Sequence, residues 1–342
     1  MPRRTRHDGC LAERRGGMRR RRFIEGVALT GGVLLLDRRE SSATRLPFVP
    51  GPAVPRFRSL TDDPAYLDAR PCFSPRGDTV LFMRSPAADQ EISSFWTAPA
   101  SGGVAAEPFF ADDDLQATRP DWSWSRTSYE VAFTGIRDGL FGVYLLDVRT
   151  RDVIQLPAGD PTVDLMQYPS WYPNGRSLVV TNYRRGLNQI VRLDLDRPGV
   201  LTPLTDPALV WEGMSSVSPS RRAGNPIAFA GQLPVGEYNQ DDNQIWIQEA
   251  GEDPFQANPG QGRTPWWSPD GERIAYESNR DAPGGQQVYQ IFQLTPENDD
   301  PVATTPHALA AQHAKWSPSG RSIVFAAAFP GLDGGGIAVV DL

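Results

Sequence analysis

A five-residue phrase that recurs six times constrains the fold of this chain more than any other feature. Its fullest copy, Trp-Ser-Pro-Asp-Gly, begins at Trp267, and we call the first residue of each copy its anchor. The anchors are Phe73, Trp122, Trp171, Val217, Trp267 and Trp316. The intervals between them are 49, 49, 46, 50 and 49 residues. A near-constant period of this length indicates a repeat architecture, and such scaffolds mostly present surfaces for binding.

Each repeat is predicted to hold four short β-strands. In the fifth repeat a first strand ends at a proline, and Asp270-Gly271 then supplies the tight-turn signal. Two runs of alternating polar and apolar residues and one weaker run follow. The four runs are Thr264–Pro269, Arg273–Ser278, Val288–Leu294 and Pro301–Thr305. Four strands in 40–50 residues form one propeller blade. The six anchors therefore predict an all-β fold, a six-bladed β-propeller of four-stranded blades.

The two ends of the chain predict how the ring closes. Ile337–Leu342 matches the third strand of the second repeat, Tyr144–Val148, so the sixth blade lacks its fourth strand. Leu60-Thr61-Asp62 repeats Leu204-Thr205-Asp206, which ends a fourth strand. We therefore expect Arg56–Thr61 to complete the last blade, which hides an edge strand that would otherwise invite aggregation.

The repeat resembles the TolB-type β-propeller repeat, whose consensus is close to Pro-x-Trp-Ser-Pro-Asp-Gly followed by a strand and Ser-Asn-Arg-Asp. Here these segments are Pro265–Gly271 and Ser278–Asp281, and the resemblance covers residues 53–342. Repeats two and four depart most from the consensus in their turns. The resemblance implies a propeller of the cell envelope, where such proteins dock peptidoglycan-associated lipoproteins. TolB also carries an α/β domain before its propeller, for which residues 44–52 leave no room.

Residues 1–43 have the composition of an export signal. They hold 11 arginines, an apolar run at Gly26–Leu36 and small residues at Ser41–Ala43. The apolar run is too short to span a bilayer. Arg20–Ile24 resembles the twin-arginine motif. We therefore predict a cleaved signal at 1–43, a linker at 44–52 and a periplasmic or secreted propeller at 53–342.

Three alternatives for this segment stay open: a basic arm for nucleic acid, an uncleaved membrane tether, and a start at Met18. Without residues 1–43 the chain keeps 23 Lys or Arg and 36 Asp or Glu, a net charge near −13. An acidic domain is a poor nucleic-acid binder, because neutralising phosphates dominates that affinity. Cys72 is then the single cysteine, so no internal disulfide forms. We expect a monomer with no nucleic-acid partner.

The search for catalytic residues gives no candidate set. The chain has three histidines, His7, His307 and His313, no Gly-x-Ser-x-Gly elbow and no zinc-type spacing. We therefore predict no catalytic residues, no cofactor and no metal. Two acidic runs, Asp112–Asp114 and Asp241–Asp242, are read as solvated loops, with a calcium site as the alternative.

The predicted partner site surrounds the channel mouth. In a propeller, the loop before each first strand and the loop between the second and third strands open on the same face. Residues three positions before the anchors, with their neighbours, should therefore ring the channel. The predicted partner-binding residues are Arg70, Arg119, Tyr168, Trp211, Glu212, Arg263 and His313. Arginine and tryptophan are enriched at binding hot spots. The alternative is that each arginine pairs with a neighbouring acid.

Two functions of different classes follow. The first is an exported, non-enzymatic propeller that binds a protein or an anionic glycan through its channel mouth. The alternative is a propeller enzyme, a polysaccharide lyase or a lactone hydrolase that acts in the channel, with calcium as a candidate metal. Glu212, Asp68 and His313 are the nearby groups that such an enzyme could use.

Overall fold

The computed structural model describes residues 55–125, 129–157, 160, 164–184, 187–206, 208, 211–220, 224–236, 239–282, 288–296, 298–328 and 335–342. Pro52–Leu342 forms one compact unit. The predicted export signal and linker, residues 1–52, lie outside the described ranges. In the ranges given above, no helix has both the length and the apolar character needed to cross a membrane.

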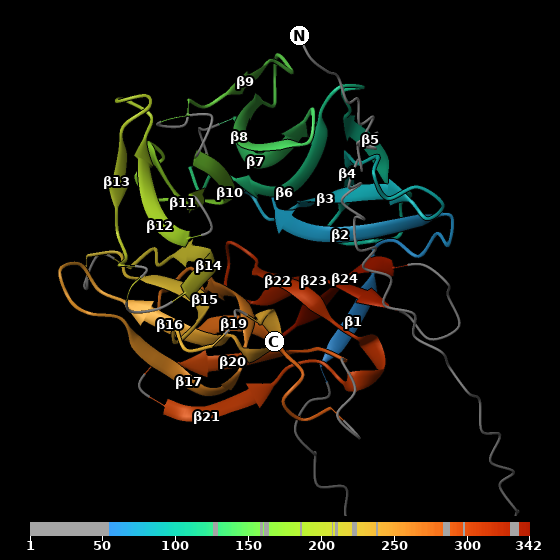
Figure 1. Cartoon of the computed structure of the whole chain (residues 1–342). Coiled ribbons are helices and arrows are strands. Elements are labelled where there is room, and N and C mark those ends of the chain that lie inside the picture. The colour runs from blue at the N-terminus through green and yellow to red at the C-terminus, as the bar shows by residue number, and fades with distance from the viewer. Residues whose placement is uncertain are drawn as a thin grey trace, which may run out of the picture. The chain divides into compact units, whose positions relative to one another are not determined.

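The regular structure is almost entirely β, and antiparallel sheets follow one another around a ring (Figure 1). Four of the sheets have four strands each, taken in chain order. The first two are β6 (Gln116–Trp122), β7 (Glu130–Arg137), β8 (Leu140–Asp147) and β9 (Val153–Gln155), then β10 (Asp164–Trp171), β11 (Ser177–Arg184), β12 (Leu187–Asp194) and β13 (Leu201–Pro203). The next two are β14 (Trp211–Val217), β15 (Ile227–Gln232), β16 (Gln244–Gln248) and β17 (Phe255–Gln261), then β18 (Arg263–Trp267), β19 (Ile274–Ser278), β20 (Gln290–Thr295) and β21 (Asn298–Ala303).

A fifth sheet has eight strands and contains both ends of the described chain. Its strands are β1 (Arg56–Ser59), β2 (Tyr66–Phe73), β3 (Thr79–Pro86), β4 (Ser94–Pro99), β5 (Glu107–Phe110), β22 (Gln312–Trp316), β23 (Ser322–Ala328) and β24 (Gly335–Asp341). One parallel pair, Leu67 with Gly335, joins β2 to β24. The all-β class and the propeller arrangement are confirmed. The count of six blades stays a prediction. In a six-bladed ring, this eight-stranded sheet would be two blades joined by the single pair of Leu67 with Gly335.

The recurring phrase forms the same turn in several sheets. In the fifth repeat the Gly271 amide donates to the Ser268 carbonyl at 2.9 Å, and Gly271 has a φ of 74°. Glycine is required here twice over, because a Cβ at this position would lie 2.5 Å from the Cβ of Ser220 in the preceding repeat. The turn therefore packs each repeat against its neighbour.

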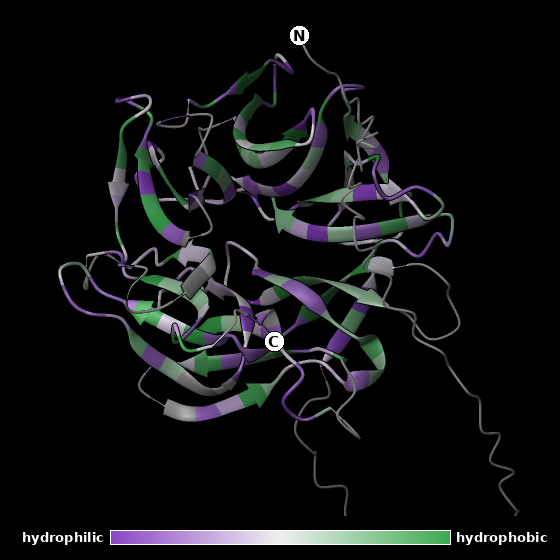
Figure 2. Cartoon of the chain, in the orientation of Figure 1, coloured by the Kyte–Doolittle hydropathy of each residue, from purple (hydrophilic) through white to green (hydrophobic). Residues whose placement is uncertain are grey.

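The anchors lie in the core between sheets. Trp171 is fully buried, and Trp267 and Trp316 are 3% exposed. The Trp171 indole donates to the Asp121 carbonyl at 3.0 Å, which ties β10 to β6. Hydrophobic and hydrophilic residues alternate in bands along many of the strands (Figure 2). Trp171, Trp267 and Trp316 therefore belong to the packing of the fold, and Trp122 is half-buried against the core.

The predicted ring closure is confirmed. β1 pairs antiparallel with β24, from Arg56 opposite Asp341 to Ser59 opposite Ala338. Beyond β1, the Ile337 amide donates to the Thr61 hydroxyl at 2.9 Å. In the third repeat, the Ile190 amide makes the equivalent bond to Thr205 at 3.0 Å. The N-terminal strand thus makes the contacts that a fourth strand makes elsewhere in the ring.

Removal of the closing strand should expose the edge of β24. We expect a chain that starts after Thr61 to aggregate, or to unfold at a much lower temperature than the full chain, because its unpaired N–H and C=O groups invite intermolecular pairing. A chain that starts at residue 55 is the matched control and should melt like the full chain. Light scattering and thermal unfolding measure both. Equal behaviour of the two truncations would contradict the closure.

Candidate functional site

A β-bulge interrupts the innermost strand of each repeat at the same place. The pairing register of β2, β6, β10, β14, β18 and β22 shifts just before each anchor. The residue three positions before the anchor adopts a left-handed conformation each time. These residues, with their φ values, are Arg70 (54°), Arg119 (52°), Tyr168 (56°), Met214 (52°), Thr264 (47°) and His313 (57°). Non-glycine residues rarely adopt this conformation, and it is a genuine outlier for a β-branched residue such as Thr264.

Proline follows the left-handed residue in four of the six bulges. These prolines are Pro71, Pro120, Pro169 and Pro265. A bulge takes residues out of the hydrogen-bonded ladder, and proline has no N–H that would need a partner there. A proline at this position of the bulge therefore removes no hydrogen bond from the sheet.

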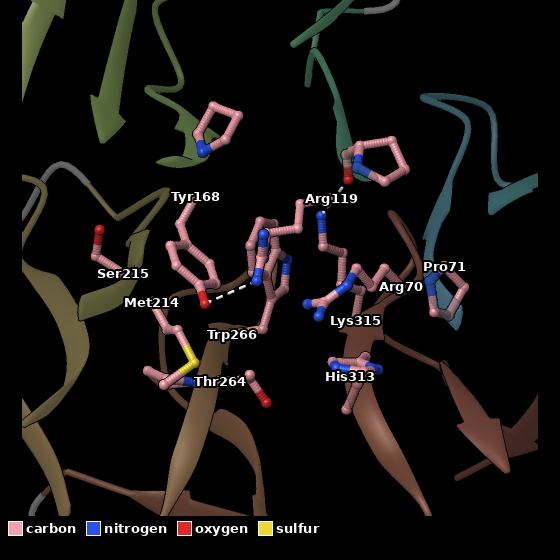
Figure 3. A pocket seen from close by; sticks show the side chains of 14 residues that line it. Arg70, Pro71, Arg119, Tyr168, Met214, Ser215, Thr264, Trp266, His313 and Lys315 are labelled. Carbon is pink, nitrogen blue, oxygen red and sulfur yellow. Dashed lines mark hydrogen bonds between the residues drawn. The ribbon is translucent and has the colours of Figure 1, made fainter. Parts of the chain in front are cut away.

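The six bulges converge on one cavity in the channel, with a volume of about 70 Å³ (Figure 3). Its lining consists of the left-handed residues, the residues that follow them, and two residues next to anchors. The complete lining is Arg70, Pro71, Arg119, Pro120, Tyr168, Pro169, Met214, Ser215, Thr264, Pro265, Trp266, His313, Ala314 and Lys315. Four of the seven predicted site residues, Arg70, Arg119, Tyr168 and His313, therefore lie together.

Arg119 is held by neutral groups. Its guanidinium lies 4.1 Å from the centre of the Tyr168 ring and donates to the Tyr168 hydroxyl at 2.9 Å (Figure 3). A longer bond of 3.5 Å reaches Gln167. Neither partner carries a negative charge, so these contacts orient the guanidinium but do not neutralise it.

Arg70 makes no hydrogen bond or ion pair with any residue that the structure describes. Burial lowers the pKa of its guanidinium to about 9, and the positive charge of Arg119 adds to that effect. The group stays protonated at neutral pH. Because Arg119 also lacks an acidic partner among the described residues, the channel mouth holds two positive charges that no described carboxylate pairs with.

Arg263 pairs with a neighbouring acid, which is the alternative stated above for the arginines. It donates to Glu277 at 2.9 Å and 3.0 Å, and it stacks 4.2 Å from the centre of the Tyr289 ring. Glu277 is fully buried, and its other oxygen accepts the His313 amide at 2.8 Å. Burial alone would raise the pKa of Glu277, but Arg263 outweighs that effect and the pKa is lowered. This pair reinforces the wall and is absent from the cavity lining.

Asp68 does not line the cavity, and His313 lines it as a neutral ring. Trp211 and Glu212 lie on β14, and their side chains are outside the described ones. Asp68 is buried in a two-point ion pair with Arg84, with both N–O distances at 2.7 Å. Burial lowers the pKa of the His313 imidazole to about 3, and Arg70 adds to that effect, so the ring is neutral at neutral pH. Neither Asp68 nor His313 is therefore poised as a general base.

The acidic runs do not form a visible metal centre. Asp112 accepts the Asp114 amide at 2.9 Å and lies 3.7 Å from Arg137. Among the described residues, no group of three or more His, Cys, Asp and Glu side chains could hold a metal ion.

Sequence reasoning missed Lys315, which forms the floor of the cavity. Its ammonium group donates to the Pro120 carbonyl at 2.8 Å and to Asp121 at 3.1 Å, and lies 3.9 Å from the centre of the Trp266 ring. A second cavity, which Cys72 also lines, lies beyond this floor and shares with the first only Trp266 and Lys315. Lys315 is the one lysine of the chain, and that signal was available in the sequence.

Several buried polar atoms of the lining have no hydrogen-bond partner among the described residues. They are Arg119 Nε, Ser215 Oγ, Thr264 Oγ1 and His313 Nδ1. A buried polar group that lacks a partner costs about 1–3 kcal/mol. Four of them around one cavity indicate a surface that a polar ligand group would complete.

No family model matches the chain. An uncharacterized protein of Agrobacterium fabrum is 28% identical over 207 residues, which cover 58% of this chain and 66% of that protein. A solved TolB-type structure from Agrobacterium tumefaciens has a TM-score of 0.58 at 17% identity, over 81% of this chain and 90% of that chain. The fold is a TolB-like β-propeller. An oligogalacturonate lyase from Vibrio parahaemolyticus shares it too, with a TM-score of 0.53 at 12% identity, over 84% of this chain and 97% of that one. The fold therefore does not choose between binding and catalysis.

Lys315→Met tests the cavity floor. It leaves the buried Asp121 carboxylate without its ion-pair partner, which costs about 3–5 kcal/mol near neutral pH. Burial already raises the pKa of Asp121 in the folded protein, and the loss of Lys315 raises it further. Protonation then favours the folded state, so the penalty should be greatest at neutral pH and shrink toward about pH 4. Urea unfolding across this range measures it.

The double variant Lys315→Met/Asp121→Asn is the control for charge. It should recover part of the stability and flatten the pH dependence, because no carboxylate remains at this position. A pH-independent loss in the single variant would assign Lys315 to packing alone.

Proposed function

We propose that this protein is an exported, non-enzymatic β-propeller that binds an anionic partner, a protein segment or a glycan, through the mouth of its channel. One observation carries the proposal: Arg70 and Arg119 face the same cavity, and neither is paired with an acid among the described residues. Three other cations each have a carboxylate partner: Arg84, which is buried, and Arg263 and Lys315, which are partly buried.

The charge of the whole propeller supports an anionic partner. Residues 44–342 carry a net charge near −13, so most of the surface repels anions. A local positive site on such a body focuses an anion toward the channel mouth. The apolar lining lowers the local dielectric there, which strengthens each contact with a charged group.

The state of the ionisable groups favours binding over acid–base catalysis. A general base needs a pKa near the working pH and access to the substrate. Asp68 is engaged by Arg84, and the His313 ring has a pKa of about 3. The two groups of the enzyme reading that the structure describes are thus occupied or unsuited to proton transfer at neutral pH.

The proposal includes a location in the periplasm or outside the cell. Arg20–Ile24 and the apolar run Gly26–Leu36 support export by the twin-arginine route, which carries folded proteins. The likeness of the fold to TolB is in keeping with an envelope protein. A single propeller without a partner copy is proposed as the working unit.

The binding site is tested with Arg70→Gln/Arg119→Gln. The probes are a fluorescein-labelled, Glu-rich peptide, prepared with a free and with an amidated C-terminus, and labelled heparin. Charge-assisted hydrogen bonds contribute about 1.5–3 kcal/mol each, so the double variant should bind the recognised probe at least about tenfold more weakly. Fluorescence anisotropy at low salt measures the affinity.

The matched control is Arg76→Gln/Arg321→Gln, which removes two exposed arginines from the turns that follow two anchors. It makes the same change in net charge and should leave both affinity and melting temperature unchanged. If both double variants weaken binding equally, or if neither does, the channel mouth is not the anion site.

Export is tested with a reporter fused after residue 52. Arg20→Lys/Arg21→Lys should block its appearance in the periplasm, because the twin-arginine route reads the arginine pair. The matched control is Arg38→Lys/Arg39→Lys, which lies beyond the apolar run and should export normally. Continued export of the reporter by the Arg20→Lys/Arg21→Lys variant would contradict the route.

A further inference from the structure

Lys315 lies between the cavity at the channel mouth and a second cavity. It reaches from β22 to the Pro120 carbonyl and Asp121 on β6, and its ammonium group covers Trp266. Both cavities are lined by Lys315 and Trp266. A ligand that enters past Arg70 and Arg119 therefore meets this pair of side chains.

The walls divide into a charged part and an apolar part. Four prolines, Ala314, Met214 and the Trp266 ring supply apolar surface. Arg70 and Arg119 supply the two charges that no described acid pairs with. Burial of a second unpaired carboxylate against the apolar part would cost several kcal/mol. The cavity thus fits one anionic group joined to an apolar one, and not a run of charges.

The polar atoms of the lining that lack a partner are ones that can form hydrogen bonds with a ligand carboxylate. Arg119 Nε is a donor with no partner among the described residues, and the Thr264 and Ser215 hydroxyls can donate or accept. Ser215 is 4% exposed, and the Thr264 hydroxyl oxygen is buried. A planar carboxylate accepts hydrogen bonds from guanidinium and hydroxyl groups at once.

We propose that the occupant is a single carboxylate at the end of an apolar group, inserted end-first between Arg70 and Arg119. The C-terminal apolar residue of a peptide and a small apolar carboxylic acid share this chemistry. The cavity volume of about 70 Å³ takes the carboxylate end of such a group but not a folded domain. The inference rests on the proposed anion site and specifies what that site selects.

The experiment compares probes on the unmodified full chain, so it does not depend on a variant that folds. One probe is a fluorescein-labelled peptide ending in Leu-Phe with a free carboxylate, and the other is the same peptide amidated. Loss of one charge-assisted interaction corresponds to about tenfold in affinity or more. We expect the free acid to bind at least about tenfold more tightly than the amide.

Variants then locate the difference. Arg70→Gln should remove the preference for the free acid, while Arg76→Gln, an exposed arginine of the same repeat, should keep it. Thr264→Val keeps the shape and removes the hydroxyl, and should weaken binding of the free acid more than that of the amide. Melting temperatures are recorded for all three.

Competition by phenylpropionate distinguishes the two sources. Displacement of the peptide supports a small carboxylic acid as a sufficient ligand, and free-acid preference without displacement supports a peptide end. Equal binding of free acid and amide overturns this inference. So does tighter binding of the amidated Glu-rich peptide, which would leave the proposed function standing. If no anionic probe shows a dependence on Arg70, the proposed function falls as well.

Discussion

The structure of the channel depends on one constraint, a left-handed residue in the middle of each innermost strand. Six non-glycine residues with φ of 47° to 57° turn six neighbouring positions toward the axis. Such conformations cost of order 1 kcal/mol or more each, and they persist where the surrounding structure holds them. Here they coincide with the register shifts of the six bulges, whether or not a proline follows. The cavity lining is therefore a product of backbone geometry that the repeat reproduces, whatever side chain occupies the position.

The side chains at those positions then determine the electrostatics. Arg263 lies one residue before its left-handed neighbour Thr264, and it pairs with Glu277 in the wall. Arg70 and Arg119 occupy the left-handed position itself and face the cavity. A shift of one residue along the strand thus separates a structural arginine from two that remain available for an anion. The His313 ring, which also lines the cavity, is neutral and adds no positive charge to those of Arg70 and Arg119.

The repeat period predicted the strands, the anchors and the closing strand, because each is a local pattern that recurs at fixed spacing. Counting back from an anchor needs only a common geometry, and four of the seven residues selected in this way line the cavity. Two things lay beyond it. The pairing of Arg84 with Asp68 and of Arg263 with Glu277 depends on neighbouring strands. The contact of Lys315 with Asp121 joins strands 194 residues apart, and no local spacing encodes it.

Closure by the first described strand also has a kinetic consequence. The bond between Ile337 and Thr61 joins residues 276 positions apart, among the largest separations in the fold. Such contacts close a long loop of the chain, and the loss of conformational entropy on closure makes them form late in folding. Until residues 335–341 have been made, β1 has no partner, and the ring stays open. The time that β24 then spends uncovered is set by how quickly β1 and β24 find each other.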